Sequence, residues 1–170
     1  MPRTLLALLA AAGASHAQLI PLDTANPVQG GFFGTSVSGI PDVDGDGRGD
    51  VAVGAFNEAT PSSSHGGHVY IYSGSTGVRI RTINPPTIQV LGTFGSCVAG
   101  ISDLTGDGRG DLLIGGMWEY DSGSLASGRA YLYSGATGQL VRAWVSPNRQ
   151  TAGNFGWAVA PVPDINGDGI

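Results

Sequence analysis

Hydrophobic and polar positions along the chain alternate in short runs, and stretches rich in Gly, Ser, Asn and Asp separate these runs. The clearest run is His-Val-Tyr-Ile-Tyr at residues 68–72, and Arg-Ala-Tyr-Leu-Tyr at residues 129–133 has the same pattern. Alternation of β-branched and aromatic residues between turn residues is typical of β-strands. The pattern therefore predicts an all-β protein built from short strands.

These runs belong to a repeat with a constant period. The dipeptide Phe-Gly begins at the evenly spaced residues Phe33, Phe94 and Phe155, and an Asp follows each Phe nine residues later. We call the separation between Phe33 and Phe94 one repeat length. Residues 33–93 align with residues 94–154 without a gap, and a fixed period of this kind is the signature of a repeat architecture. We therefore divide the chain into a first repeat (33–93), a second repeat (94–154) and a truncated third repeat (155–170).

Each repeat predicts four strands. In the first repeat the strands are expected at residues 35–40, 50–55, 68–72 and 78–83, and in the second the later three are expected at 111–114, 129–133 and 139–145. Four strands in a repeat of about 60 residues match one blade of a β-propeller. A β-sandwich gives no reason for a gapless period, and the short periods of a β-solenoid are absent. We predict β-propeller blades, each a four-stranded antiparallel sheet, with two complete repeats plus the start of a third, as a fragment of a larger propeller.

The N-terminal residues 1–17 have the layout of a secretory signal peptide. Arg3 precedes the apolar residues 5–12, and the small residues around Ser15 and Ala17 follow them. The apolar stretch is too short to span a bilayer, which takes roughly 20 residues. We expect cleavage between Ala17 and Gln18, a lead-in segment over residues 18–32, and a secreted, extracellular or cell-envelope location. An uncleaved apolar strand or helix is the alternative.

The composition narrows the class of protein. There are 29 Gly residues among 170, which disfavours helical bundles because Gly is costly inside helices. A hydrophobic content of 41 % disfavours disorder, and a net charge of −5 disfavours nucleic-acid binding. Cys97 is the single cysteine, so an intrachain disulfide is excluded, and stability must come from packing, with bound metal as a candidate further source. We expect Cys97 to be a small buried side chain, with a reactive thiol as the alternative.

The acidic residues are concentrated in loops that have the spacing of a metal site. Residues 42–50 read Asp-Val-Asp-Gly-Asp-Gly-Arg-Gly-Asp, and residues 103–111 read Asp-Leu-Thr-Gly-Asp-Gly-Arg-Gly-Asp. Oxygen-bearing side chains at positions 1, 3, 5 and 9, with the carbonyl at position 7, can surround one Ca²⁺, which takes 6–8 oxygen ligands. The predicted metal ligands are Asp42, Asp44, Asp46, Arg48 (carbonyl) and Asp50; Asp103, Thr105, Asp107, Arg109 (carbonyl) and Asp111; and Asp164, Asn166 and Asp168.

Charge and ligand type favour calcium at these loops. Carboxylates crowded into nine residues repel one another, and a divalent cation removes this repulsion. We expect weaker binding in the second loop, where Thr105 replaces a carboxylate. The absence of Cys and of clustered His favours Ca²⁺ over Zn²⁺. Two alternatives are an EF-hand or dockerin, which would need a Glu where Val53 and Ile114 stand, and Asp/Gly-rich turns without metal.

Together these motifs resemble the FG-GAP repeat. The resemblance rests on Phe-Gly, the Asp-x-Asp-x-Asp-Gly-x-x-Asp loop, the Val-Gly-Ala that begins at Val53 and the strand over residues 67–72. FG-GAP repeats build the N-terminal β-propeller of integrin α-subunits and occur in many bacterial exported proteins. The resemblance implies a seven-bladed propeller with Ca²⁺ in loops on one face and ligand binding on the loops of the other. The chain departs from the family at Phe56 and Met117, where the family has Pro.

Three further motifs have candidate roles. Trp118 and Tyr120, in the long loop of the second repeat, are candidate contacts for a sugar or a protein ligand; ordinary blade packing is the alternative. Arg-Gly-Asp occurs at residues 48–50 and 109–111, but its Asp is expected to be a metal ligand rather than a recognition group. His65 and His68 are expected on a loop surface, with transition-metal binding as the alternative.

No catalytic motif is present, so we do not expect an enzyme. The chain contains neither Gly-x-Ser-x-Gly nor His-Glu-x-x-His. We predict an exported calcium-binding β-propeller that serves as an extracellular adhesion or protein/glycan-binding module. Its expected partner is an unidentified protein or glycan on the loop face, without nucleic acid or a membrane span, and further blades or self-association are needed for closure. The alternative is the propeller domain of a secreted hydrolase or lectin whose catalytic or sugar-binding part lies outside this chain.

Overall fold

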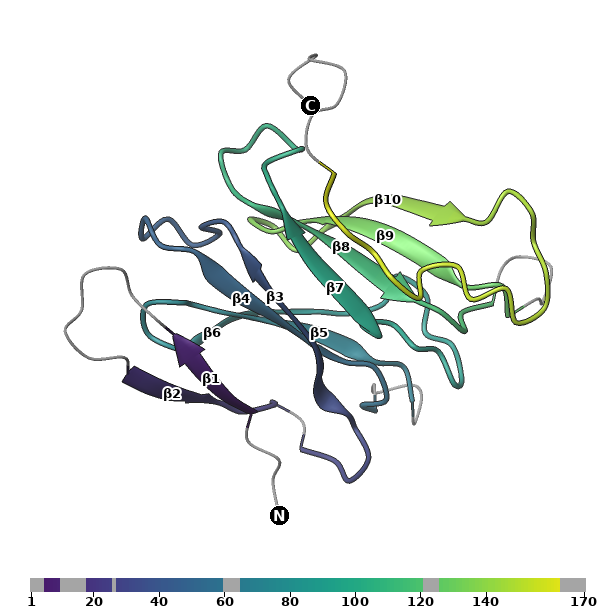
Figure 1. Cartoon of the computed structure of the whole chain (residues 1–170), viewed down its shortest axis with the longest axis horizontal. Helices are drawn as coiled ribbons and strands as arrows, with labels where there is room; N and C mark the ends of the chain where they lie inside the picture. Colours follow the sequence, from purple (N-terminus) through teal and green to yellow (C-terminus); the bar gives the residue numbers. More distant parts are fainter. Residues whose placement is uncertain (1–4, 10–17, 26, 60–64, 121–125, 163–170) are drawn as a thin grey trace.

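The computed structural model describes residues 5–9, 18–25, 27–59, 65–120 and 126–162, and these residues form strands, turns and irregular segments without any helix (Figure 1). The strands are β1 (Leu5–Leu9), β2 (Gln18–Leu22), β3 (Phe33–Ile40), β4 (Asp50–Ala55), β5 (His68–Tyr72), β6 (Arg79–Ile83), β7 (Cys97–Ile101), β8 (Asp111–Gly116), β9 (Arg129–Ser134) and β10 (Leu140–Val145). The described part of the chain holds no helix able to cross a lipid bilayer.

Two four-stranded antiparallel sheets confirm the predicted fold class. Strands β3-β4-β5-β6 form the first sheet and β7-β8-β9-β10 the second, so each sheet takes its strands in chain order from one repeat. This up-and-down order is that of a propeller blade. We call the sheets blade 1 and blade 2.

The predicted strand limits differ from the observed ones by a few residues. Strand β8 continues two residues beyond the expected end at residue 114. Strand β6 begins one residue later than expected, because the Val78 carbonyl accepts a hydrogen bond from the Ser73 amide (2.8 Å) and closes the preceding turn. The peptide group of Val78 is therefore used by the turn rather than by the sheet.

Alternation along the strands creates two apolar faces on each blade. In β5, Val69 and Ile71 point to one face while Tyr70 and Tyr72 point to the other, and all four are buried. A strand buried on both faces must have packing partners on both sides. Blade 1 therefore lies between two layers.

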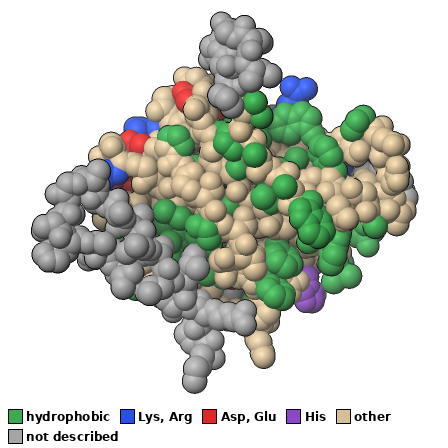
Figure 2. All heavy atoms as spheres, viewed as in Figure 1, with side chains coloured by type: hydrophobic (Ala, Val, Ile, Leu, Met, Phe, Trp, Pro, Cys, Tyr) green, Lys and Arg blue, Asp and Glu red, His purple; other side chains and the backbone are tan. Residues whose placement is uncertain are grey.

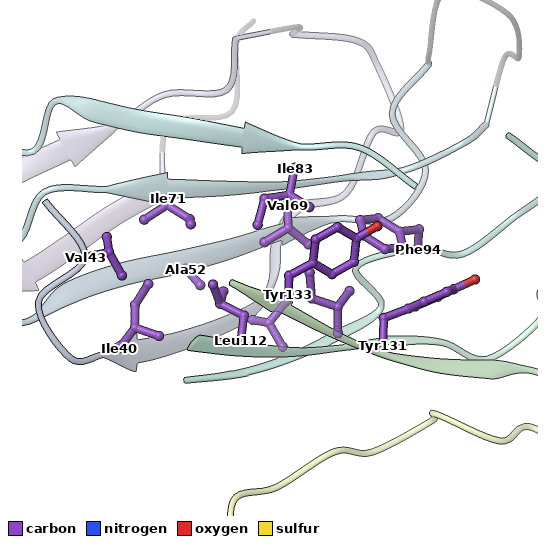
Figure 3. Packing of buried hydrophobic residues seen from close by; sticks show 12 residues of the cluster. Ile40, Val43, Ala52, Val69, Ile71, Ile83, Phe94, Leu112, Tyr131 and Tyr133 are labelled. Carbon is purple, nitrogen blue, oxygen red and sulfur yellow. The ribbon is translucent and has the colours of Figure 1, made fainter. Parts of the chain in front are cut away.

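Blade 2 is the layer on one side. Its Leu112, Tyr131 and Tyr133 pack against Val69 and Ile71 of blade 1, as Figure 3 shows. Burying each such side chain contributes roughly 1.5–3 kcal/mol. This stacking of consecutive sheets, face to face, is the packing of adjacent propeller blades.

Glycine allows the two blades to approach closely. A Cβ atom on Gly54 of β4 would collide with the carbonyl oxygen of Gly95, at the start of the second repeat. One repeat length later, a Cβ on Gly115 would collide with the carbonyl oxygen of Gly156. The Phe-Gly dipeptides of the second and third repeats thus lie directly against the second strand of the preceding blade.

The lead-in segment is the layer on the other side of blade 1. Leu22 of β2 is completely buried in a cluster with Val53 and Tyr70. Strand β2 also pairs antiparallel with β1, which lies within the predicted signal peptide. Cleavage after Ala17 stays a prediction, and the sequence analysis did not anticipate a strand in the lead-in.

Candidate metal centres and ligand face

The two acidic loops join the first and second strands of each blade. Residues 41–49 connect β3 to β4, and residues 102–110 connect β7 to β8. Gly47 and Gly108, at position 6 of each loop, have φ angles of 81° and 80°, which only Gly adopts readily. Both loops lie at the same side of the molecule, and Figure 2 shows acidic and arginine side chains gathered there, at the upper left.

The Asp at position 1 organises each loop through backbone amides. The Asp42 carboxylate accepts hydrogen bonds from the amides of Gly45 (2.5 Å) and Gly47 (2.9 Å). Asp103 accepts the same bonds from Gly106 (2.7 Å) and Gly108 (2.6 Å). These amide donors lower the pKa of both carboxyl groups, chiefly through Gly45 at Asp42 and Gly108 at Asp103. Both groups are therefore ionised at neutral pH.

The Asp at position 9 lies at the buried end of each loop. Asp50 is 2 % exposed, and its carboxylate accepts hydrogen bonds from the amides of Val43 (2.8 Å) and Gly74 (3.0 Å). Asp111 is fully buried and is bound by the amides of Leu104 (2.7 Å) and Gly135 (3.2 Å). Burial raises the pKa of Asp50, and the neighbouring acidic side chains add to the rise. A cation beside Asp50 would offset the free-energy cost of ionising this buried carboxyl group.

Three carboxylates converge in each loop. Oxygen atoms of Asp42, Asp44 and Asp50 all lie within 4.8 Å of one another, as do oxygen atoms of Asp103, Asp107 and Asp111. Two ligands of one Ca²⁺, each at about 2.4 Å, lie at most about 4.8 Å apart. The donor set is oxygen only, which suits a hard cation of this kind.

The remaining predicted ligands lie at the edge of these clusters. The Asp46 carboxylate is outside the first cluster and accepts a hydrogen bond from the Ser75 hydroxyl. The Thr105 hydroxyl lies 3.4 Å from Asp111 Oδ1, so the structure places it beside the second cluster. The predicted ligands Asp164, Asn166 and Asp168 lie outside the described residues.

The arginines at position 7 have different surroundings in the two loops. The guanidinium group of Arg109 forms an ion pair with Asp42 of the preceding blade (Nη1 to Oδ2, 3.2 Å). Arg48 is exposed, and its amide donates to Asp46 Oδ1 (2.8 Å). The positive charge of Arg109 thus lies where a cation bound to Asp42 would feel its repulsion.

The Arg-Gly-Asp tripeptides are poorly placed for recognition. Their aspartates, Asp50 and Asp111, begin β4 and β8 with buried carboxylates that backbone amides already bind. A partner has no access to these groups in the folded chain.

The candidate aromatic contacts are accessible. Trp118 and Tyr120 follow β8 and are 49 % and 40 % exposed. The side-chain oxygen of Gln89 accepts a hydrogen bond from the backbone amide of Tyr120 (2.5 Å). The side-chain nitrogen of Gln89 donates a second hydrogen bond to the backbone carbonyl of Tyr120 (3.0 Å). This pair of bonds holds the aromatic segment in place.

The sequence analysis missed a second aromatic feature. Phe32 and Phe56 stack with ring centroids 5.0 Å apart and an angle of 7° between the rings, and Phe32 is 41 % exposed. These residues flank β3 and β4 and occupy different positions in the repeat. The signal available in the sequence was Phe56, which stands where the FG-GAP family has Pro.

Cys97 and His68 differ from their predicted environments. Cys97 is half-buried rather than buried, and its sulfur accepts a bond from the Val159 amide (3.4 Å). His68 is buried rather than on a loop surface, and its ring nitrogens contact Asn84 (2.9 Å) and the Ala59 carbonyl (3.0 Å). Both nitrogens of His68 are therefore occupied by protein groups.

The similarities to known proteins agree with this geometry. The FG-GAP-like repeat family matches residues 42–114. Mouse integrin alpha-IIb is 29 % identical over 155 residues, covering 81 % of this chain, and mouse integrin alpha-3 is 28 % identical over 117 residues, covering 66 %. Bovine phosphatidylinositol-glycan-specific phospholipase D is 33 % identical over 142 residues, covering 75 % of this chain. The chain is an FG-GAP repeat protein that resembles the integrin α-subunits.

The relatives are much longer than this chain. The matched region covers 14 % of integrin alpha-IIb, 10 % of integrin alpha-3 and 16 % of the phospholipase. The similarity therefore concerns the propeller module.

Proposed function

We propose that this chain forms part of an exported, calcium-binding β-propeller that acts as an extracellular adhesion or protein/glycan-binding module. The observation that carries the proposal is the convergence of three carboxylates in the same loop of both blades. The same amide bonds to the first and last Asp recur one repeat length later, so the arrangement belongs to the repeat rather than to a single loop.

Calcium would be held by side chains at positions 1, 3, 5 and 9 and by the position 7 carbonyl. In the first loop these are Asp42, Asp44, Asp46, the Arg48 carbonyl and Asp50. In the second loop Thr105 stands at position 3, so fewer negative charges face the ion and binding is weaker there. When bound, the ion would supply positive charge that offsets the repulsion among the carboxylates of the loop.

The adhesion role is supported by the exposed aromatic residues and by the similarity to integrins. Trp118 and Tyr120 offer flat apolar surfaces with polar tips, which suit sugar rings and protein side chains alike. Gln89 holds the Tyr120 backbone, so little conformational entropy would be lost on binding.

Calcium titration with thermal unfolding tests the metal site. Addition of millimolar Ca²⁺ should raise the melting temperature, since a ligand that binds only the folded state stabilises it. Asp44→Asn removes a carboxylate of the first cluster and should weaken the response. Asp23→Asn, at an acidic residue outside both loops, is the matched control and should leave it unchanged. A melting temperature that does not respond to Ca²⁺ would refute the calcium site.

The second candidate function is the propeller domain of a secreted hydrolase. The 33 % identity to phosphatidylinositol-glycan-specific phospholipase D favours it. Release of a phosphatidylinositol-glycan-anchored reporter by the protein would support this candidate, and binding without release would support the adhesion module.

A further inference from the structure

Glu119 stands between the two exposed aromatic residues Trp118 and Tyr120, yet its own side chain is almost completely buried. We call residues 118–120 the aromatic segment. Tyr131 donates a hydrogen bond to Oε2 of Glu119, and Oε1 has no partner in the part of the chain that the structure describes. A buried carboxyl group with a single donor favours its uncharged form, because its negative charge would be poorly solvated. The side chain that anchors the aromatic segment is therefore sensitive to its own charge.

Blade 1 contains the same glutamate with a second donor. Glu58 stands one repeat length earlier, and its carboxylate accepts hydrogen bonds from Tyr70 (2.5 Å) and from Thr24 (2.6 Å). The residues on either side of Glu58 are Asn57 and Ala59, and neither is aromatic. The carboxyl group with one donor and the exposed aromatic pair therefore occur together in blade 2, and blade 1 has neither.

Two sequence differences account for the missing donor. Pro85, which has no hydroxyl group, stands one repeat length after Thr24. Gly116 stands one repeat length after Ala55, and a Cβ atom on Gly116 would lie only 2.7 Å from Cδ of Glu119. The carboxyl group in blade 2 therefore occupies space that the methyl group of Ala55 fills in blade 1.

Two groups on β9 favour the ionised form of Glu119 but do not outweigh its burial. Burial raises the pKa of this carboxyl group to about 7, while the hydrogen bond from Tyr131 and the positive charge of Arg129 act in the opposite direction. Arg129 is engaged with the backbone, since its Nε donates to the Tyr120 carbonyl (2.9 Å). Burial also raises the pKa of the Tyr133 hydroxyl on the same strand, so this group is uncharged at neutral pH.

The neighbouring segments add no charge at Glu119. Residues 84–93 accept a hydrogen bond from the Trp118 amide (2.9 Å), and residues 152–156 lie against the end of β8. Neither segment contains a titratable side chain, and Asp111 lies at the opposite end of β8. Ionisation of Glu119 in place would therefore leave a buried negative charge with a single hydrogen-bond donor.

We propose that Glu119 is a proton-controlled latch that holds Trp118 and Tyr120 against blade 2. With the proton bound, the uncharged carboxyl group stays buried beside Tyr131 and the aromatic segment is closed. When the proton leaves, opening of the aromatic segment brings the carboxylate into water. The population with an open aromatic segment therefore grows as the pH rises.

The pH range of the latch follows from the pKa of Glu119 in the two states. In the open segment the carboxyl group has its ordinary pKa near 4.5, and in the closed segment the pKa is about 7. The opening equilibrium constant therefore rises between these two values and levels off above the higher one. Raising the pH from about 5 to about 8 should increase this constant roughly fiftyfold.

The latch has a consequence for ligand binding. A ligand that binds Trp118 and Tyr120 in the closed arrangement would be held at mildly acidic pH and released as the pH rises. This consequence alone rests on the proposed function. The latch itself depends on hydrogen bonds and burial within the chain, so a test without ligand separates it from the adhesion role.

Hydrogen exchange of the full chain tests the latch. The backbone amides of Trp118, Glu119 and Tyr120 all donate hydrogen bonds in the closed segment, so their exchange, corrected for the intrinsic rate at each pH, measures opening. The amides of Asn57 and Glu58 also donate hydrogen bonds and are the matched reference in blade 1. Between about pH 5 and about pH 8 the opening constant should rise roughly fiftyfold in the aromatic segment and stay nearly constant at the reference amides.

Three variants assign the pH dependence to this carboxyl group. Glu119→Gln carries no titratable group and should abolish the rise, whereas Glu58→Gln should keep it. The double variant Gly116→Ala with Pro85→Thr reproduces the surroundings found in blade 1. It should reduce the rise to less than about fivefold, because a second donor lowers the pKa of the closed state.

Three results would overturn the latch. One is an opening constant of the aromatic segment that does not change with pH. Another is a rise shared equally by the reference amides in blade 1, which would show that the proton acts on the whole fold. The third is a full rise in Glu119→Gln or in the double variant, which would assign the titration to another group.

Discussion

Glu58 and Glu119 occupy the same position in the two blades, but their carboxylates have different partners. Both are about 1 % exposed. Glu58 accepts hydrogen bonds from Tyr70 (2.5 Å) and from Thr24 of the lead-in (2.6 Å). Glu119 accepts one from Tyr131, while its Oε1 has no partner among the described residues. Pro85, which has no hydroxyl group, stands at the position equivalent to Thr24 in the next repeat. Burial raises the pKa of Glu119 to about 7.

This raised pKa makes stability depend on pH. Below the unfolded pKa near 4.5 the group is protonated in both states and costs nothing. Between that pKa and about 7 the unfolded state ionises while the folded carboxyl group stays protonated, so the free energy of unfolding falls as the pH rises across this range. We expect Glu119→Gln to gain stability relative to the unchanged chain between pH 4 and pH 8, by up to about 3 kcal/mol. Urea unfolding at several pH values measures the free energy of unfolding of both chains. A difference between the two chains that stays constant with pH would contradict the prediction.

At the scale of the elements, the strand sequence matters most where two blades meet. Alternation decides which side chains of β4, β5, β8 and β9 face each neighbouring layer. Glycine at a few strand positions then decides how close the layers come. Gly54 in β4 faces the Gly95 carbonyl, while Gly39 in β3 has the Asp50 carbonyl oxygen 4.0 Å from the position of an added Cβ.

These two glycines provide a matched pair of substitutions. Gly54→Ala should destabilise the chain by about 2 kcal/mol or more, because the added methyl group forces the second repeat away from blade 1. Gly39→Ala adds the same methyl group in ordinary contact and should change the free energy of unfolding by less than about 1 kcal/mol. Denaturant unfolding measures the free energy of unfolding of both variants. Equal losses in the two variants would show that Gly54 does not control the distance between the blades.

At the scale of the whole molecule, the two candidate metal loops are connected electrostatically. The Arg109 guanidinium group, from the second loop, is 3.2 Å from Asp42 of the first. The pair is partly exposed, so its direct contribution to stability is small. Its charge nevertheless repels a divalent cation bound at the first loop.

Removal of the Arg109 charge should strengthen cation binding at the first loop. We expect Arg109→Gln to tighten Ca²⁺ binding at the first loop by roughly three- to tenfold at low ionic strength, because one repulsive interaction is lost. Added salt should reduce the gain, since it screens exposed charges. Calorimetric titration checks this, and Arg48→Gln, at an exposed side chain, serves as the control. An affinity unchanged by Arg109→Gln would refute the coupling.

Local patterns accounted for the four strands of each blade and for the residues of the two loops. Residues 68–72 alternate strictly, and the spacing of Asp42, Asp44 and Asp50 is a property of the chain itself. The surroundings of His68 and Cys97 were not predictable, because their neighbours, such as Asn84 and Val159, are distant in sequence.

The sequence by itself determined the repeat, the strand order and the position of the acidic loops, because each depends on residues close together in the chain or related by the repeat period. The tertiary structure decided which residues of different repeats contact one another. The stacking of the two blades, the Arg109–Asp42 pair, the differing partners of Glu58 and Glu119, and the place of β2 beside blade 1 all depend on contacts between distant segments. Such contacts form only when buried faces are matched in three dimensions, and no local pattern encodes which face meets which.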